Sequence, residues 1–404
     1  MDQLLAISLL LGLGLLLGEI AHRFRFPRVA GYLVAGIVLS PKISGVIPAA
    51  FLSGTNVVVN AALAIITFEV GGTLSFRALK ELGKAIVFLA LGEAEIAALA
   101  VLTGGLLVLP FLLRVPGANS FAAALPLALL MGALATPTDP SATLAVMHQY
   151  RARGMVSFSI MGAAAFDDAL AIINFSVATA VAIILATRSA TSLFAFFQPF
   201  IGILSSLALG VGIGLIYQGV AKLLGKSEDG IQIALILAVL LLGFGLGTLL
   251  KLDALLVTMT SGMTLVNARR LRPRIFQLLE RSVEPLVFLL FFTLSGLYLD
   301  FAVLIKHFPL VLLFVALRTG GKLSGAYLGA TLGRAPPSVR RYTGLGLIPQ
   351  GGIVIGLALS MRGIPELASF ADILVNVAIG ATVIHELVGP FVAKLALERA
   401  GEIQ

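Results

Sequence analysis

The chain alternates long apolar runs with short segments that carry charges or proline. A helix needs about 20 apolar residues to cross a bilayer, and most of the runs approach that length. Marking them between polar breaks predicts thirteen spans, at about 3–21, 29–46, 54–76, 84–113, 120–148, 155–187, 193–224, 230–250, 252–267, 284–304, 307–331, 342–361 and 369–397. The run 252–267 is the weakest, because it is short and opens with Asp253. The pattern predicts an all-α polytopic membrane protein.

Composition supports this prediction and excludes other classes. Of the 404 residues, 59% are hydrophobic and 12% are charged, whereas soluble domains are about 25% charged. The absence of cysteine excludes disulfides, cysteine nucleophiles and cysteine-ligated zinc. No Walker-type phosphate loop, His/Glu metal cluster or nucleophile triad is evident in the sequence. We therefore expect a transporter driven by an ion gradient, not an enzyme, with no cofactor.

Lysine and arginine alternate in number between successive turns. Most of them lie in or beside the turns that follow odd-numbered spans, and the turns after even-numbered spans carry about one each. Positive loops lie on the cytoplasmic side, which predicts an outer N-terminus and a cytoplasmic C-terminus. The net charge of +8 is then a topology signal, and we expect no nucleic-acid partner.

Ionisable residues inside spans are costly and are functional candidates by default. They are Glu69, Glu93, Glu95, Asp139, Asp167, Asp168, Arg318, Lys322 and Glu386, with His385 beside the last. Asp167 and Asp168 lie in FDDALAI near the middle of span six. Adjacent helical residues point about 100° apart, so one aspartate can bind an ion while the other pairs with a fixed cation.

Proline interrupts two spans. Pro137 and Pro140 bracket Thr138 and Asp139, and this predicts a break in span five, because proline lacks a backbone donor and clashes with the preceding turn. Each break taken singly is equally compatible with a simple kink.

A similar break is expected in span twelve, where Pro349 precedes Gln350, Gly351 and Gly352. The two breaks lie seven spans apart, and an odd offset inverts orientation. We therefore predict inverted-topology repeats at about 1–187 and 229–404, joined by a linker helix at 188–228. Crossed broken helices at a repeat interface commonly form the ion site of secondary transporters.

Span eleven supplies two buried cations. Arg318 and Lys322 are four residues apart and therefore share a helix face. The aspartate pair, with Glu93 or Glu95, can provide their partners. Lysine is the better switching partner, because arginine stays charged.

The other candidates are less specific. Glu69, Glu93, Glu95 and Glu386 fit either a functional role or structural ion pairs and hydrogen bonds. His385 fits a hydrogen-bonded interior histidine better than a proton relay.

The segments ATPTDPSA, FDDALAI and GGKLSGAYLGA, in this order, resemble those of the monovalent cation/proton antiporter superfamily, in particular its bacterial sodium/hydrogen and potassium/proton branch. The resemblance implies that Asp168 binds a monovalent cation or a proton in turn. It also implies that Asp167 pairs with Lys322, and that Thr138 and Asp139 cap the site. The implied architecture is a homodimer whose core domain moves as an elevator.

This chain departs from the pattern in two places. Many relatives carry charges at the second break, where residues 349–352 are neutral here. Some continue into a cytoplasmic regulatory domain, and we expect no soluble regulatory domain before Gln404.

The expected function is Na⁺/H⁺ antiport in the inner or plasma membrane of a bacterium or archaeon. Exchange of K⁺ or Li⁺ stays open, as does a K⁺ efflux pathway. A sodium-coupled organic-anion symporter fits less well, because two aspartates argue against an anionic substrate.

Overall fold

The computed structural model describes residues 2–52, 54–112, 120–187, 193–224, 228–268, 274–298, 305, 307–361, 364 and 367–403. The loop cations Arg114, Arg188, Lys226, Arg269, Arg270, Arg272, Lys306 and Arg362 lie outside these ranges. Within them the chain forms helices and no strand. The helices are α1 (Gln3–Arg23), α2 (Arg28–Leu39), α3 (Ala49–Leu52), α4 (Asn56–Thr73), α5 (Phe76–Leu112), α6 (Ser120–Leu134), α7 (Pro140–Gln149), α8 (Met155–Thr187), α9 (Leu193–Leu224), α10 (Asp229–Leu249), α11 (Ala254–Val266), α12 (Arg274–Ser282), α13 (Glu284–Tyr298), α15 (Phe308–Leu332), α16 (Pro337–Gly346), α17 (Gly352–Ser360) and α18 (Ala368–Arg399).

Helix length and composition confirm a polytopic membrane protein. In the described part of the chain, seven helices are long and apolar enough to cross a bilayer, and five further apolar helices are shorter. The predicted count of thirteen spans is not confirmed. The run 252–267 forms only the 13-residue α11, whose N-terminus is capped by Asp253 through the backbone N–H of Leu256. Span four is longer than predicted, since α5 has 37 residues.

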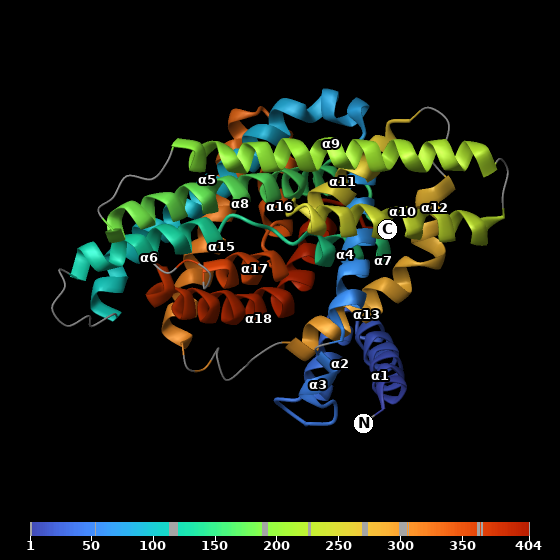
Figure 1. Cartoon of the computed structure of the whole chain (residues 1–404), viewed down its shortest axis with the longest axis horizontal. Helices are drawn as coiled ribbons and strands as arrows, with labels where there is room; N and C mark the ends of the chain where they lie inside the picture. The colour runs from blue at the N-terminus through green and yellow to red at the C-terminus, as the bar shows by residue number, and fades with distance from the viewer. Residues whose placement is uncertain are drawn as a thin grey trace.

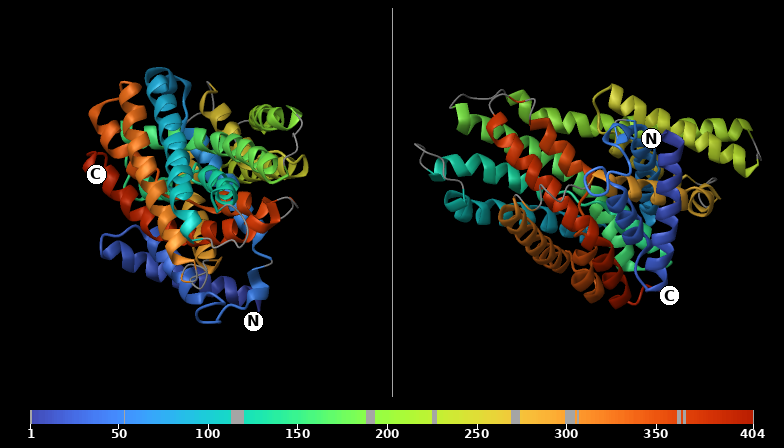
Figure 2. Two further views of the ribbon diagram at one scale, coloured as in Figure 1. Left: turned by 90° about the vertical axis from the view of Figure 1, so that its left-hand side faces the viewer. Right: turned by 90° about the horizontal axis from the view of Figure 1, so that it is seen from below.

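The helices pack into two groups (Figures 1 and 2). One, which we call the core group, contains α5–α8 and α15–α18. The other, the flanking group, contains α1, α2, α4 and α9–α13. Most helix-to-helix contacts fall within a group, and those between the groups are sparser and run mainly through α2, α4, α7, α8, α9 and α18. The predicted division into repeats around 188–228 stays a prediction.

Glycines bring α5 and α15 into close contact, the most extensive helix pair in the described structure. A Cβ atom on Gly325 would overlap the backbone of Gly92, and one on Gly329 would overlap that of Phe88. Small residues allow two helix backbones to approach closely. As a result, side chains that face this seam, including Glu93 and Lys322, meet inside the bundle.

Both predicted helix breaks are present. The first separates α6, ending at Leu134, from α7, beginning at Pro140. The second separates α16, ending at Gly346, from α17, beginning at Gly352. The two breaks cross, because the backbone N–H of Asp139 donates to the carbonyl oxygen of Pro349 at 3.0 Å.

Candidate functional site

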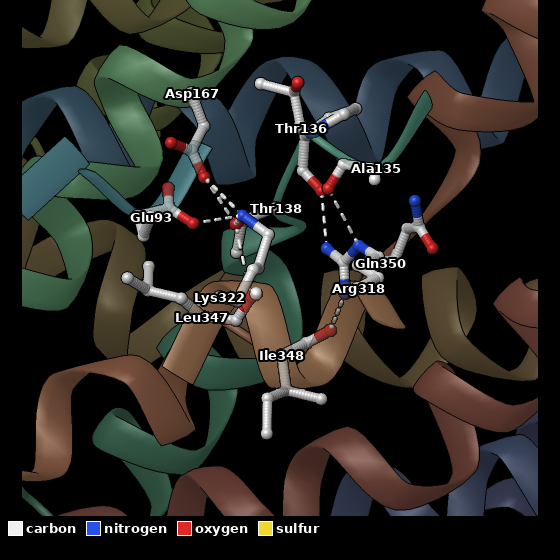
Figure 3. A network of polar contacts seen from close by, with 12 residues as sticks. Glu93, Ala135, Thr136, Thr138, Asp167, Arg318, Lys322, Leu347, Ile348 and Gln350 are labelled. Atoms are coloured by element: carbon white, nitrogen blue, oxygen red, sulfur yellow. Dashed lines mark hydrogen bonds and ion pairs between the residues drawn. The ribbon is translucent and has the colours of Figure 1, made fainter. Parts of the chain in front are cut away.

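Lys322 lies at the centre of a fully buried polar group (Figure 3). Its ammonium donates to Thr138 Oγ1 at 2.7 Å and to Asp167 Oδ2 at 3.1 Å. It also donates to Glu93 Oε2, and the Thr138 hydroxyl donates to Asp167. The group therefore joins α5, α8 and α15 to the first helix break.

This group carries more negative than positive charge. Glu93, Asp167 and Lys322 sum to one negative charge when all three are ionised. One oxygen of each carboxylate, Glu93 Oε1 and Asp167 Oδ1, has no hydrogen-bond partner among the described residues. Burial of an uncompensated charge is costly, so the site favours binding of one further positive charge, either a proton or a cation.

Arg318 has a different set of partners from those expected. We anticipated a carboxylate, but its guanidinium donates to the backbone carbonyls of Ala135 at 3.1 Å, Pro137 at 2.7 Å and Ile348 at 2.7 Å (Figure 3). These carbonyls follow the C-termini of α6 and α16, where the helix dipole is negative. The planar guanidinium suits several acceptors at fixed angles. Arg318 is thus a fixed cation that provides hydrogen-bond donors for free backbone carbonyls at both breaks.

A neutral side chain completes the crossing. Gln350 donates from Nε2 to the carbonyl of Leu134 at 2.8 Å, and its Oε1 lies 3.0 Å from His385 Nδ1. Gln350 therefore satisfies a carbonyl at the end of α6 without carrying a charge. The position of His385 agrees with an interior hydrogen-bonded histidine.

Asp139 forms the N-cap of α7. Its Oδ1 accepts from the backbone N–H of Ser141 at 2.8 Å, which satisfies one of the free donors at a helix N-terminus. A Cβ atom on Gly351 would overlap the Asp139 carboxylate, so the second break passes directly beside this cap.

A cavity of about 470 Å³ reaches the crossing. It extends from the exposed Asn56 and Tyr298 to Thr138, Asp139 and Glu386. Asn56 begins α4, at the end that the charge pattern predicts to be outside. The cavity therefore connects the first break with that end of α4.

The placement of the other candidates is mixed. Asp168 lies in α8, but its side chain is outside the described residues. Glu95 accepts a hydrogen bond from Asn174 Nδ2 at 3.1 Å, and among the described residues it has no hydrogen bond to the Lys322 group. Glu69 belongs to a separate cluster with His148 and Glu284.

No residue spacing in the sequence indicates that separate cluster. One ligand atom each from Glu69, His148 and Glu284 lies within 4.8 Å of the others. The sequence shows no His/Glu metal motif, and the folded chain nevertheless brings these three potential ligand atoms together. His148 and Glu284 stand at the ends of predicted spans, where polar residues are ordinary, and 136 residues separate them. Only the packing of α4, α7 and α13 brings the three together.

The all-helical fold with two crossed broken helices defines an integral membrane transporter. Residues 6–399 match the family model described as "Sodium/hydrogen exchanger, transmembrane", and the chain belongs to that family.

Among curated proteins, it is 24% identical over 293 residues to the Na⁺/H⁺ antiporter NhaP of Pseudomonas aeruginosa, a match that covers 66% of each chain. The matched region thus spans slightly under two thirds of that relative's length.

Two solved structures of the sodium proton antiporter MjNhaP1 from Methanocaldococcus jannaschii share the fold. The structure at pH 8 has a TM-score of 0.65 and 20% identity, with 99% of this chain and 96% of that chain covered. The structure from electron microscopy has a TM-score of 0.73 and 20% identity, with both chains covered completely.

Proposed function

We propose that the protein is a secondary active antiporter that exchanges Na⁺ for protons across the membrane. The observation that carries the proposal is the buried group of Lys322, Asp167 and Glu93, which has one negative charge in excess and lies beside the crossing of two broken helices. The excess negative charge favours a proton or a monovalent cation at the adjacent Asp168, and alternate occupation is what exchange requires. Membership of the sodium/hydrogen exchanger family supports the same reading.

In this mechanism Asp168 binds cation and proton in turn. Cation binding there displaces a proton and weakens the ion pair between Asp167 and Lys322, so that a second proton is released. Thr138 bonds to both members of that pair and adjusts with it. Arg318 and Gln350 hold the breaks together throughout, because their partners are backbone carbonyls that do not titrate.

Alternating access follows if the core group moves against the flanking group as an elevator in a homodimer. The sparse contacts between the groups support such a movement. The cavity lined by Asp139 and Glu386 fits a state open to the outside. The proposed orientation has the N-terminus outside and the C-terminus in the cytoplasm of a bacterium or archaeon.

The test is an exchange assay in proteoliposomes that contain a pH-sensitive dye. Addition of Na⁺, Li⁺ or K⁺ to separate samples should move protons in the opposite direction, with Na⁺ giving the largest response. Asp168→Asn should abolish the response. Glu398→Gln, an exposed position on α18, is the matched control and should leave it unchanged.

Each other outcome selects a different function. A larger response to K⁺ indicates a K⁺/H⁺ antiporter, and cation flux without proton movement indicates an efflux pathway. Proton movement that persists in Asp168→Asn contradicts the site. A membrane potential imposed with valinomycin should alter the rate of the wild type but not that of Lys322→Ala, if the lysine takes part in coupling. If Lys322 is permanently paired, exchange is electroneutral in both proteins.

A further inference from the structure

A second buried polar cluster lies away from the Lys322 group. Glu69 comes from α4, His148 from the last turn of α7, and Glu284 from the first residue of α13. His148 Nδ1 bonds to Glu284 Oε2, and each residue offers an atom within 4.8 Å of the other two. The cluster therefore joins one helix of the core group to two helices of the flanking group.

Glu69 has no partner that explains its position. Glu69 is only 4% exposed, and neither of its carboxylate oxygens has a hydrogen-bond partner among the described residues. A buried carboxylate without a partner is costly, and this one lies within reach of a histidine nitrogen and a second carboxylate. A positive group located between the three side chains would remove this cost.

Charge balance favours a divalent cation as that group. A neutral imidazole and two carboxylates around a divalent ion make a cluster with no net charge. An imidazolium with two carboxylates leaves one negative charge uncompensated in a buried place. Histidine nitrogen together with carboxylate oxygen is a ligand set that Zn²⁺ accepts, commonly with three protein ligands and one open position.

The cluster is accessible from one side of the protein. A cavity of about 990 Å³ is lined by His148 and Glu284, and the side chain of His148 is 28% exposed. Its other lining residues include Arg28, Arg151, Arg153 and Arg281, which lie in or beside segments that the charge pattern predicts to be cytoplasmic. These arginines oppose an approaching cation at long range, but such interactions are screened over about 8 Å at physiological ionic strength. The inner ligands then decide the affinity.

We propose that Glu69, His148 and Glu284 form a binding site for Zn²⁺ at the junction of the core and flanking groups, entered from the predicted cytoplasmic side. A bound ion ties α7 to α4 and α13. If the core group moves during exchange, the ion arrests that movement. This consequence rests on the proposed function, whereas binding itself does not.

Binding is tested by isothermal titration of ZnCl₂ into the full chain in detergent at 0.15 M salt. We expect one Zn²⁺ per chain in the wild type, and an affinity at least about tenfold weaker in Glu69→Gln and in His148→Asn, since losses of this size follow even from changes around metal ligands. His307→Asn is the matched control, because His307 contacts Asn376 at a different place and should not affect binding. Equal affinity in all four proteins, or no saturable binding to the wild type, overturns the proposal.

A second measurement does not depend on the variants folding correctly. Co²⁺ added to the wild type should give the intense visible absorption of a four-coordinate ion, and one equivalent of Zn²⁺ should remove it. A weak octahedral spectrum contradicts the site.

In proteoliposomes, Zn²⁺ on the cytoplasmic side should inhibit exchange by the wild type but not by Glu69→Gln. Zn²⁺ binding without any cation exchange would contradict the proposed function and leave the metal site standing.

Discussion

The backbone N–H of Asp139 donates a hydrogen bond of 3.0 Å to the carbonyl oxygen of Pro349. This bond joins the break between α6 and α7 to the break between α16 and α17. Two residues more than 200 positions apart thereby pair backbone groups that have no partner within their own interrupted helices. Around the same point, Arg318 and Gln350 bond to three carbonyls of the first break and one of the second.

Removal of the lysine at the centre of the buried group should destabilise the protein strongly. Lys322→Ala leaves Glu93 and Asp167 buried beside each other without a cation. Loss of one partner of a buried ion pair costs about 3–5 kcal/mol. The melting temperature of the detergent-solubilised chain should fall markedly, whereas Lys84→Ala, at an exposed position, should leave it unchanged. The triple variant Glu93→Gln/Asp167→Asn/Lys322→Met should recover most of the loss. If the melting temperature does not recover, the loss of stability comes from the packing of the lysine side chain and not from unpaired charge.

Arg318 should be irreplaceable by lysine. Lysine keeps the charge but has no planar fork, so Arg318→Lys cannot reach all three carbonyls in one geometry. A hydrogen bond to a charged group contributes about 1.5–3 kcal/mol, and we expect a loss of that order for each carbonyl left unpaired. The melting temperature should fall for Arg318→Lys and further for Arg318→Gln. Arg151→Lys, at an exposed position, is the control. Equal stability of Arg318→Lys and the wild type would show that charge alone is required.

Two glycines near the second break provide a matched pair. A Cβ atom on Gly351 would overlap the carboxylate of Asp139, whereas one on Gly356 meets nothing within 4 Å. Gly351→Ala should therefore displace the N-cap of α7, at a cost of about 1 kcal/mol from the cap alone, and reduce exchange in proteoliposomes. Gly356→Ala should preserve both stability and exchange. If the two variants behave alike, the close approach of Gly351 to Asp139 is not required for stability or exchange.

The C-terminal segment should stabilise α8, the helix that carries the aspartate pair. Glu402 Oε1 accepts from the backbone N–H of Val156 at 2.7 Å, and Oε2 accepts from the N–H and hydroxyl of Ser157 at 2.8 and 2.6 Å. A carboxylate at a helix N-terminus satisfies free donors and complements the dipole. Glu402→Gln should lower stability by about 1–2 kcal/mol, in the range of lost caps. Hydrogen exchange at the start of α8 should increase, and Glu398→Gln should have no such effect. Unchanged exchange there would exclude a capping role.

The sequence was sufficient for features that depend on local chemistry or on the surrounding solvent. Long apolar runs predict membrane-spanning helices whatever the packing. In lipid the backbone polar groups must be hydrogen-bonded within the protein, and a helix does this within one segment. Proline at 137, 140 and 349 disfavours a continuous helix, and both breaks were predicted from it. Proline alone is not sufficient for a break, because Pro110, Pro126 and Pro390 lie within helices. The number of spans was less predictable, since short and broken helices do not follow a rule of length.

Tertiary structure decided which groups meet. Arg318 and Lys322 share a helix face, and the sequence did not distinguish their partners. The glycine seam between α5 and α15 places Lys322 against Glu93, while the crossing places Arg318 against carbonyls. Glu93 and Glu95 are likewise separated by their orientation on α5, one toward Lys322 and the other toward Asn174. The cluster of Glu69, His148 and Glu284 depends entirely on packing. Hydrophobicity specifies that a segment is buried, but the choice of neighbour depends on helix approach and rotation, which are properties of the whole bundle.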